Sequence, residues 1–281
     1  MAEVAGSNPA EPTFKISNDS IEEYLDILRL SGVTERHIKE VNRTLINYKK
    51  YILSVIDKQK SIQFFSKLQK ECSTSYYRKQ MYQLIRFLKY LKIKWTDEIS
   101  LPKEPVYSAK RITKTDIENT LIYFEDNVKL KALVHLGISS GCRAMELYQL
   151  SIEDIDIVNR ILYVKHEPIN NKSTKTKLSR VTFFSKEAQR YLKKYIETKP
   201  ERLFAQKTCD RAFNNIELKV KDLRKYFSQE WDRRGGPTSI KKILMGHSLN
   251  GDVDLQHYNA QSEEDLKKIY DNVMLNHTIK C

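Results

Sequence analysis

The chain has 281 residues, of which 40% are hydrophobic and 30% charged, a balance that suits a globular protein and excludes a disordered one. Its 49 lysines and arginines against 36 acidic residues give a formal net charge of +13. Such an excess predicts a polyanionic partner, of which nucleic acid is the commonest. A basic surface that serves only solubility is the alternative. The length accommodates two domains of ordinary size.

Cysteine spacing and hydropathy exclude further classes of protein. The four cysteines, Cys72, Cys142, Cys209 and Cys281, include no Cys-x-x-Cys pair and have no histidine at a zinc-ligand spacing. They predict reduced thiols in a cytoplasmic protein without a metal centre. No apolar run approaches the roughly 20 residues that span a bilayer. The small, polar residues 1–17 predict a disordered tail rather than a signal peptide.

Residues 18–95 are predicted to form a compact bundle of four amphipathic helices. In the first helix, Ser20 and Glu23 have capping-box spacing, and Gly32 follows the end of the apolar stripe. Apolar residues three and four apart continue the pattern in the other three helices. These are expected after Thr34, across residues 62–68 and after Thr74.

The fourth of these helices has a basic face opposite its apolar one. A solvated surface accounts for such a face, but the positive charge of the whole chain favours contact with nucleic-acid phosphates. Arg78, Lys79 and Arg86 are the candidate DNA-binding residues of this domain.

Residues 96–112 are predicted to link two domains. Pro102 and Pro105 interrupt any helix there, and no hydrophobic period survives. Helix resumes in the second domain, where Thr115 and Glu118 repeat the capping-box spacing.

The second domain, residues 113–281, is predicted to be mostly helical with a small antiparallel sheet, an α+β fold. Three short β-rich runs are expected to form the sheet, at residues 154–157, 161–164 and 180–184. The long loop between the second and third strands is basic. It contains three candidate lysines, Lys172, Lys175 and Lys177.

Arg143 is the first candidate for binding an anion. It follows the small residues 139–141 at the start of a helix, where free backbone N–H groups favour an anion. Its guanidinium adds a bidentate donor at the same place. Glu146, one turn on, lies on the same helix face and is placed to orient Arg143. An ordinary surface arginine is the alternative interpretation.

Lys221 and Arg224 form a second pair of cations, three residues apart on one face of a helix. Leu223, Phe227 and Trp231 occupy another face of that helix and are expected to anchor it in the core. The two cations would then be held by a rigid support, as a phosphate-binding site requires.

His247 and Tyr258 complete the set of candidate site residues. His247 follows a helix that ends at Gly246, and Tyr258 lies in a polar stretch. The set lacks the carboxylate cluster that would hold Mg²⁺ for phosphoryl transfer. It suits attack of a tyrosine oxygen on a phosphodiester, with cations stabilising the charge of the transition state.

These motifs resemble those of the tyrosine recombinases, the family of phage integrases and Xer recombinases. SSGCRAMELYQLSIEDIDI resembles the first box of the family and makes Arg143 the first catalytic arginine, and KDLRKYFSQ makes Arg224 the second. LMGHS implies that His247 is the next catalytic member, 23 residues after Arg224. HYNA implies that Tyr258, 11 residues later, is the nucleophile. The N-terminal helices resemble the DNA-clamping core-binding domain of the family.

Two features depart from the usual motifs. Lys221 stands where the second box normally begins with histidine, and a similar lysine occurs in integrases of archaeal viruses and plasmids. The resemblance therefore favours that branch and gives Lys221 a phosphate-contacting role. It also implies a catalytic lysine in the hairpin loop, for which we favour Lys175, while Lys172 and Lys177 compete for that role and are candidate DNA contacts.

The resemblance implies a reaction and its partners. Tyr258 would attack a DNA phosphate to leave a 3′-phosphotyrosyl link and a free 5′-hydroxyl, without a cofactor or metal. The partner would be double-stranded DNA at a specific attachment site. A homo-tetramer, assembled on DNA from a protein that can be monomeric in solution, would exchange strands through a Holliday junction.

Other functions remain open at this point. A Xer-type resolvase of chromosome or plasmid dimers has the same chemistry, and a type IB topoisomerase uses the same residues as a monomer. A non-enzymatic DNA-binding protein of this fold would not need the complete Arg, Arg, His, Tyr set. The last predicted helix, after Ser262, has an apolar stripe that would dock on a neighbouring subunit, as in relatives, or on its own domain. Its members are Leu266, Ile269, Tyr270 and Val273.

Overall fold

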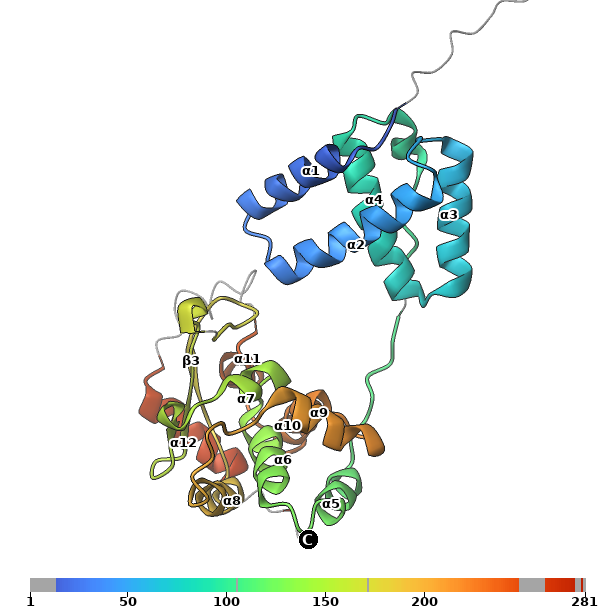
Figure 1. The fold of residues 1–281 in the computed structure, drawn as a ribbon. Helices are drawn as coiled ribbons and strands as arrows, with labels where there is room; N and C mark the ends of the chain where they lie inside the picture. Colours follow the sequence, from blue (N-terminus) through green and yellow to red (C-terminus); the bar gives the residue numbers. More distant parts are fainter. Residues whose placement is uncertain (1–13, 105, 171, 248–260, 276–278, 280–281) are drawn as a thin grey trace, which may run out of the picture. The chain divides into compact units, whose positions relative to one another are not determined.

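The computed structural model describes residues 14–104, 106–170, 172–247, 261–275 and 279. The chain forms two compact units, Met1–Ser108 and Ala109–Cys281, called here the N-terminal and C-terminal units (Figure 1). The expected nucleophile Tyr258 and most of the expected tail lie outside the described residues. None of the described helices is long and apolar enough to cross a bilayer.

The N-terminal unit contains the four helices that its apolar periodicity predicts. They are α1 (Asn18–Leu30), α2 (Glu35–Tyr51), α3 (Lys58–Glu71) and α4 (Thr74–Tyr90), followed by the 3-10 helix η1 (Lys94–Glu98) (Figure 1). The predicted cap of the first helix is wrong, because the hydroxyl of Ser17 accepts the N–H of Ser20 at 2.9 Å. Both Ser17 and Ser20 precede the apolar stripe, so the stripe alone does not indicate which of them caps the helix.

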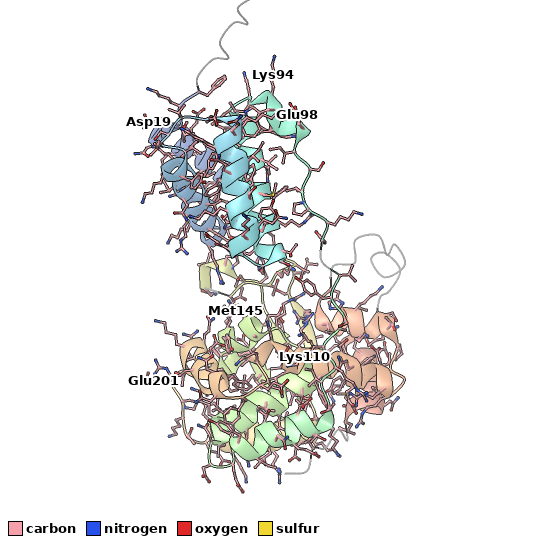
Figure 2. The ribbon with its side chains drawn as sticks, turned by 90° about the vertical axis from the view of Figure 1, so that its right-hand side faces the viewer. Asp19, Lys94, Glu98, Lys110, Met145 and Glu201 are labelled. Carbon is pink, nitrogen blue, oxygen red and sulfur yellow. The ribbon has the colours of Figure 1, made fainter. Side chains whose placement is uncertain are left out.

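The apolar stripes of all four helices form one core. Its largest buried side chains include Tyr24, Tyr48, Leu84, Phe87 and Leu88. The hydroxyls of Tyr48 and Ser61 lie 2.6 Å apart and satisfy one another inside this core. Charged side chains lie on the outside, among them the labelled Asp19, Lys94 and Glu98 (Figure 2).

The prediction of a disordered tail over residues 1–17 is wrong for Lys15 and Ile16. Lys15 pairs with Val55 in an antiparallel bridge, and the N–H of Ile16 donates to the carbonyl of Ser54 at 2.8 Å. Ile16 is buried in the core. Burial of this apolar side chain lowers the free energy of the folded state. The prediction was based mainly on the small, polar residues that precede Ile16.

The linker predicted for residues 96–112 is also shorter than expected. Thr96 is buried within η1, and Ile112 is buried in the core of the C-terminal unit. The N–H of Ile112 donates to Oε1 of Gln229 at 2.9 Å. Pro102 lies beyond the end of η1, and the side chains on either side of the linker remain free to pack.

The C-terminal unit is mostly helical, as predicted. Its helices are α5 (Lys114–Tyr123), α6 (Val128–Ser140), α7 (Ala144–Gln149), α8 (Lys186–Ile196), α9 (Gln206–Ala212), α10 (Val220–Arg233), α11 (Thr238–Met245) and α12 (Glu263–Met274), with 3-10 turns η2 (Ile152–Asp154), η3 (Pro168–Asn170) and η4 (Phe213–Asn215) (Figure 1). The capping box of α5 is formed by Thr113 and Asp116, and not by Thr115 and Glu118 as predicted.

The small antiparallel sheet is confirmed. Its strands β1 (Ile155–Asp156), β2 (Ile161–Val164) and β3 (Arg180–Phe183) lie in the order β1-β2-β3. The register pairs Val164 with Arg180, so β3 begins opposite the end of β2. The basic loop therefore connects the end of β2 to the adjacent start of β3, at one end of the two strands.

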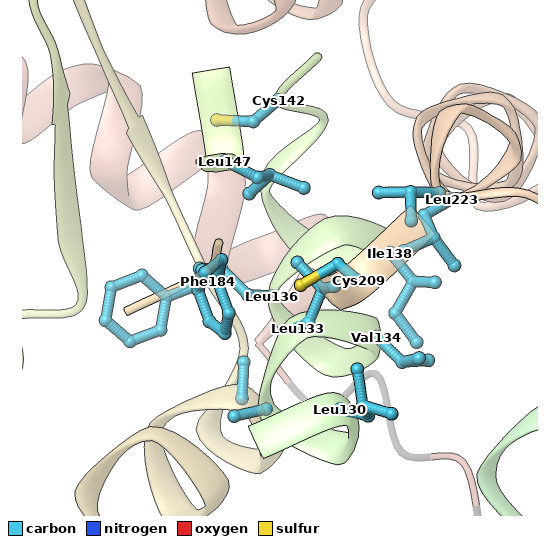
Figure 3. Packing of buried hydrophobic residues seen from close by; sticks show 14 of the residues in the cluster. Leu130, Leu133, Val134, Leu136, Ile138, Cys142, Leu147, Phe184, Cys209 and Leu223 are labelled. Atoms are coloured by element: carbon cyan, nitrogen blue, oxygen red, sulfur yellow. The ribbon is translucent and has the colours of Figure 1, made fainter. Parts of the chain in front are cut away.

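α6 runs through the centre of the C-terminal unit and is buried on almost every side (Figure 3). α10 crosses it at Gly137, where a Cβ atom would lie only 2.7 Å from Cδ1 of Leu223. A glycine at this position therefore lets the two helices approach. The close contact packs α10, which carries Arg224, directly against the buried helix α6.

α12 packs on its own unit, the second of the two arrangements considered for the last helix. Leu266, Tyr270 and Met274 are buried in a cluster with Phe183 and Trp231. The hydroxyl of Tyr270 also donates to the carbonyl of Ser139 at 2.8 Å.

Candidate active site

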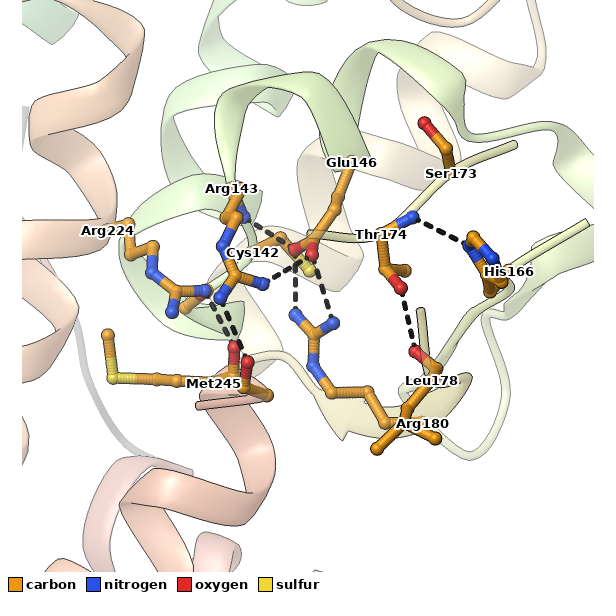
Figure 4. A network of polar contacts seen from close by, with 12 residues as sticks. Cys142, Arg143, Glu146, His166, Ser173, Thr174, Leu178, Arg180, Arg224 and Met245 are labelled. Carbon is orange, nitrogen blue, oxygen red and sulfur yellow. Dashed lines mark hydrogen bonds and ion pairs between the residues drawn. The ribbon is translucent and has the colours of Figure 1, made fainter. Parts of the chain in front are cut away.

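The turn between α6 and α7 positions Arg143. Gly141 ends α6 in the left-handed conformation, with a φ of 67°, and Arg143 is the cap of α7. The backbone N–H of Arg143 donates to Oε2 of Glu146 at 2.7 Å, and its Nη1 donates to Oε1 at 2.8 Å. Glu146 thus orients Arg143, as the sequence predicts (Figure 4).

Arg224 is presented by α10. The predicted apolar face of this helix is fully buried, with Leu223, Phe227 and Trp231. On another face, Nη1 of Arg224 donates to the carbonyl of Gly141 at 2.7 Å and to that of Met245 at 2.8 Å. The guanidinium is therefore fixed between the end of α6 and the end of α11.

The end of α11 brings the two arginines together. Nη2 of Arg143 donates to the carbonyl of Gly246 at 2.9 Å, one residue beyond the Met245 carbonyl that Arg224 binds. Carbonyl groups at a helix C-terminus carry partial negative charge, which attracts guanidinium groups. One helix end thus holds both arginines near one another (Figure 4).

His247 leaves α11 through a tight turn at Gly246. Gly246 has a φ of 63°, and the N–H of His247 returns to the carbonyl of Lys242 at 3.0 Å, the Schellman pattern. Burial, followed by the charges of Arg224 and Arg143, lowers the pKa of His247. The imidazole is therefore neutral at neutral pH and able to donate one hydrogen bond and accept another.

One buried carboxylate balances several guanidinium groups in this cluster. Burial alone would raise the pKa of Glu146, but hydrogen bonds from Arg180 and Arg143 lower it. Burial, then the neighbouring Arg143, lowers the pKa of Arg224 to about 10, so Arg224 stays charged at neutral pH. The cluster keeps an excess of fixed positive charge, which a reaction at a phosphodiester requires.

Arg180 belongs to this cluster, although sequence reasoning did not identify it. Its Nη1 and Nη2 donate to Oε1 and Oε2 of Glu146 at 3.1 and 2.7 Å. The only signal in the sequence was an arginine at the start of an apolar strand. If such an arginine is buried, it needs an acidic partner.

The structure separates the three candidate lysines of the hairpin loop. Lys172 pairs with the buried Asp154, and Lys165 reaches the other oxygen of the same carboxylate at 3.0 Å. These two lysines anchor the base of the loop. Lys175 and Lys177 are exposed.

Replacing Asp154 with asparagine is expected to lower Tm and to remove a pH-dependent part of the stability. Burial alone would raise the pKa of Asp154, but bonds from Lys172 and Ser151 lower it to about 2. Because this lies below the unfolded value near 3.9, the stabilisation, about 2 kcal/mol, is present above about pH 4 and is lost as the pH falls through 2. Thermal melts of both proteins at pH 6 and pH 2.5 measure it. A difference in Tm that does not shrink at the lower pH would contradict the expectation.

Lys221 lies exposed in the first turn of α10, on the helix that also presents Arg224. Tyr258 lies outside the described residues, so the structure brings together the arginines and the histidine without the nucleophile. Within the described ranges, no group of three or more potential metal-ligating side chains occurs.

The predicted DNA-binding cations of α4 have partners within the N-terminal unit. Arg78 pairs with Glu104 at 3.2 Å, Lys79 pairs with Glu40, and the guanidinium of Arg86 lies 5.6 Å from the centre of the Tyr82 ring. Arg86 and Lys79 are exposed, and Arg78 is half-buried.

The chain is similar to several known proteins. The profile of the phage integrase family matches residues 110–265. A probable integrase/recombinase of Acholeplasma phage L2 is 29% identical over 199 residues, 66% of this chain and 62% of that protein. Tyrosine recombinase XerA of Pyrococcus horikoshii is 24% identical over 246 residues, 86% of this chain and 83% of the relative. A lambda integrase tetramer bound to a Holliday junction has a TM-score of 0.63 at 13% identity, over 82% of this chain and 76% of that chain.

The likeness to lambda integrase shows the fold, and the family match covers more than half of the chain. The matched range includes Arg143, Arg224 and His247, the residues that the structure gathers at the end of α11. The chain therefore belongs to the phage integrase family, the tyrosine recombinases.

Proposed function

We propose that this protein is a site-specific DNA recombinase that cleaves and rejoins DNA through a 3′-phosphotyrosyl intermediate. The observation that supports this function is the convergence of Arg143 and Arg224 on the last turn of α11, next to His247. Two fixed guanidinium groups are preorganised donors for the nonbridging oxygens of one phosphate.

Tyr258 is the proposed nucleophile. Its oxygen forms a bond to phosphorus as the bond from phosphorus to the 5′ oxygen breaks. The phenol loses its proton to water, and the leaving 5′ oxygen gains one. The products are a 3′-phosphotyrosyl link and a free 5′-hydroxyl. Attack by a 5′-hydroxyl reverses the step on the same or another strand, and because one ester replaces another, no ATP is needed.

The cationic residues have separate proposed roles in this step. Arg143, Arg224 and His247 contact the nonbridging oxygens, where negative charge increases in the transition state. Lys221 adds positive charge near the same phosphate. Lys175 protonates the leaving 5′ oxygen, and its exposure in the hairpin loop supports this role over the ion-paired Lys172.

Double-stranded DNA at a specific attachment site is the proposed partner, and the protein is proposed to act on it in the cytoplasm. The net charge of +13 supports phosphate contacts by both units. The proposed contacts are Arg78, Lys79, Arg86, Lys172 and Lys177. Three of them are ion-paired in the structure, so DNA phosphate would have to replace a carboxylate at each. The tetrameric lambda integrase on a Holliday junction supports a tetramer on DNA here.

Integration of a viral or plasmid element is the proposed use of this chemistry. The 29% identity to a phage protein named as a probable integrase/recombinase supports it. The match to XerA covers more of both chains, which makes resolution of chromosome or plasmid dimers the second candidate.

A two-site plasmid assay tests the proposed function. Candidate sites are taken from the DNA that flanks the gene, placed as a direct repeat and incubated with protein in EDTA. Site-dependent excision is the expected result. Relaxation of supercoils without site preference would indicate a type IB topoisomerase instead, and binding without any cleavage would indicate a non-enzymatic protein.

The three hairpin lysines are expected to respond differently to alanine substitution. Loss of the general acid should slow cleavage by about 10²–10⁴-fold. A substrate with sulfur as the 5′-bridging atom has a leaving group that needs no proton, so it should restore cleavage only where the acid was lost. Rescue of Lys175→Ala, and not of Lys172→Ala, is expected in single-turnover assays. Rescue of Lys177→Ala but not of Lys175→Ala would transfer the role to Lys177.

A further inference from the structure

Arg180 connects three elements of the proposed active site. It is the first residue of β3, directly after the loop that carries Lys175. Its Nη1 and Nη2 bind the two oxygens of Glu146 in α7, and its Nε donates to the carbonyl of Leu244 in α11 at 2.8 Å. One side chain therefore ties the lysine hairpin to both helix ends that present catalytic groups (Figure 4).

The side chain of Arg180 is part of the interior. It is 8% exposed, against 23% for Arg143. A Cβ atom at Gly246 would lie 2.8 Å from Cδ and 2.9 Å from Nε of Arg180. Glycine at position 246 thus allows both the left-handed backbone conformation and the close approach of the Arg180 side chain. The arginine fills the space beneath the end of α11 and is directed toward Glu146.

Arg180 and Arg143 share one carboxylate. Oε1 of Glu146 accepts from Nη1 of Arg143 at 2.8 Å and from Nη1 of Arg180 at 3.1 Å, and the Glu146 side chain is only 2% exposed. With both oxygens held by the Arg180 fork, the carboxylate cannot rotate freely. A lysine at position 180 could not span both oxygens and the Leu244 carbonyl, because an ammonium is a single point.

We propose that Arg180 is a positioning residue for DNA cleavage: it fixes Glu146, and through it Arg143, and holds the end of α11 in register with the lysine hairpin. The inference rests on the proposed function, since the step that Arg180 supports is attack on a DNA phosphate. Arg180 acts without contacting DNA. Its removal therefore affects the rate of the chemical step and leaves DNA affinity almost unchanged.

The first test is single-turnover cleavage of a nicked suicide substrate by Arg180→Lys. Residues that orient a reactive group typically contribute about 10- to 100-fold to activity, and a loss of this size is expected at saturating DNA. The Kd for DNA is expected to change by less than about twofold. A normal rate, or a rate loss explained by weaker binding alone, would overturn the proposal.

Arg160→Lys is the matched control. Arg160 has an 11% exposed side chain, and its Nη2 binds both oxygens of Asp271 at 2.9 and 2.8 Å. Within the described part of the chain, Arg160 forms no hydrogen bond or ion pair with Arg143, Arg224 or His247; its partners are Phe184 and Asp271. The substitution removes a buried fork of the same kind, so a comparable loss of stability is expected with cleavage within about twofold of wild type. If both substitutions slowed cleavage equally, the effect of Arg180→Lys would be a general effect of lost packing, and the positioning role would be refuted.

A spectroscopic measurement keeps the inference testable apart from the proposed function. The Nε–H resonance of Arg143, assigned by its loss in Arg143→Lys, is expected to shift in Arg180→Lys and to stay in place in Arg160→Lys. An unmoved resonance would refute the link through Glu146. If Arg180→Lys does not fold, Glu146→Gln is expected to shift the same resonance. Wild type that forms no adduct would refute the function itself, whereas an active Arg180→Lys would refute only the positioning role.

Discussion

Replacing Tyr258 with phenylalanine is expected to abolish DNA cleavage and recombination while DNA affinity stays within about twofold of wild type. The substitution removes only the oxygen that bonds to phosphorus, and the cationic residues that bind the phosphate remain. Trapping with a nicked suicide substrate and a binding titration on the same DNA measure both quantities. An adduct formed by Tyr258→Phe would show that another residue is the nucleophile.

The structure argues against two other tyrosines, Tyr270 and Tyr226, as the nucleophile. Tyr270 is completely buried and donates to the carbonyl of Ser139, and burial raises its pKa. Burial also raises the pKa of Tyr226, to about 12. Both side chains are buried, so neither phenol is accessible to a DNA phosphate in this structure. The exposed Tyr123 provides a control, because Tyr123→Phe is expected to cleave at the wild-type rate.

Arg224→Ala is expected to slow single-turnover cleavage by about 10²–10³-fold, the cost of losing one preorganised donor to a developing charge. Arg143→Ala is expected to have an effect of the same size. Arg224→Lys should recover only part of the rate, because Nη1 of Arg224 is engaged by the carbonyls of Gly141 and Met245, and a lysine ammonium has no second nitrogen that could bind the phosphate while these bonds persist. Rates measured at saturating DNA separate this effect from binding.

Lys221→Ala is the comparison for these arginine variants. Lys221 lies exposed on the same helix, so its loss should cost less than the loss of Arg224, and Lys221→His should retain much of the activity. A wild-type rate for Arg224→Ala would remove Arg224 from the site. A wild-type rate for Lys221→Ala would remove only Lys221 from the proposed set.

The helices and the small sheet could be predicted because each element carries its own apolar period. Their exact ends could not, since Ser17 and Ser20, and likewise Thr113 and Thr115, are alternative caps two or three residues apart. The choice between them depends on tertiary packing, such as the burial of Ile16, which a local pattern does not contain.

The site could be predicted to the extent that its residues lie in local motifs. Short sequence motifs surround Arg143, Arg224 and His247. Glu146 lies one helical turn from Arg143, with which it pairs. Arg180 has no such signal, because its contact with Glu146 joins residues 34 positions apart through the folding of the sheet onto α7. The ion pair between Lys172 and Asp154 in the hairpin loop could not be predicted for the same reason, since it joins residues 18 positions apart.

Peptide mapping of the trapped protein–DNA adduct is the most direct measurement of the proposed chemistry. Wild-type protein is incubated in EDTA with a nicked suicide duplex, digested with a protease and analysed by mass spectrometry. The predicted result is a nucleotide joined through its 3′-phosphate to the peptide that contains Tyr258, with a free 5′-hydroxyl on the released strand. An adduct on any other residue, a 5′-phosphate linkage, or cleavage that requires a divalent metal would contradict it.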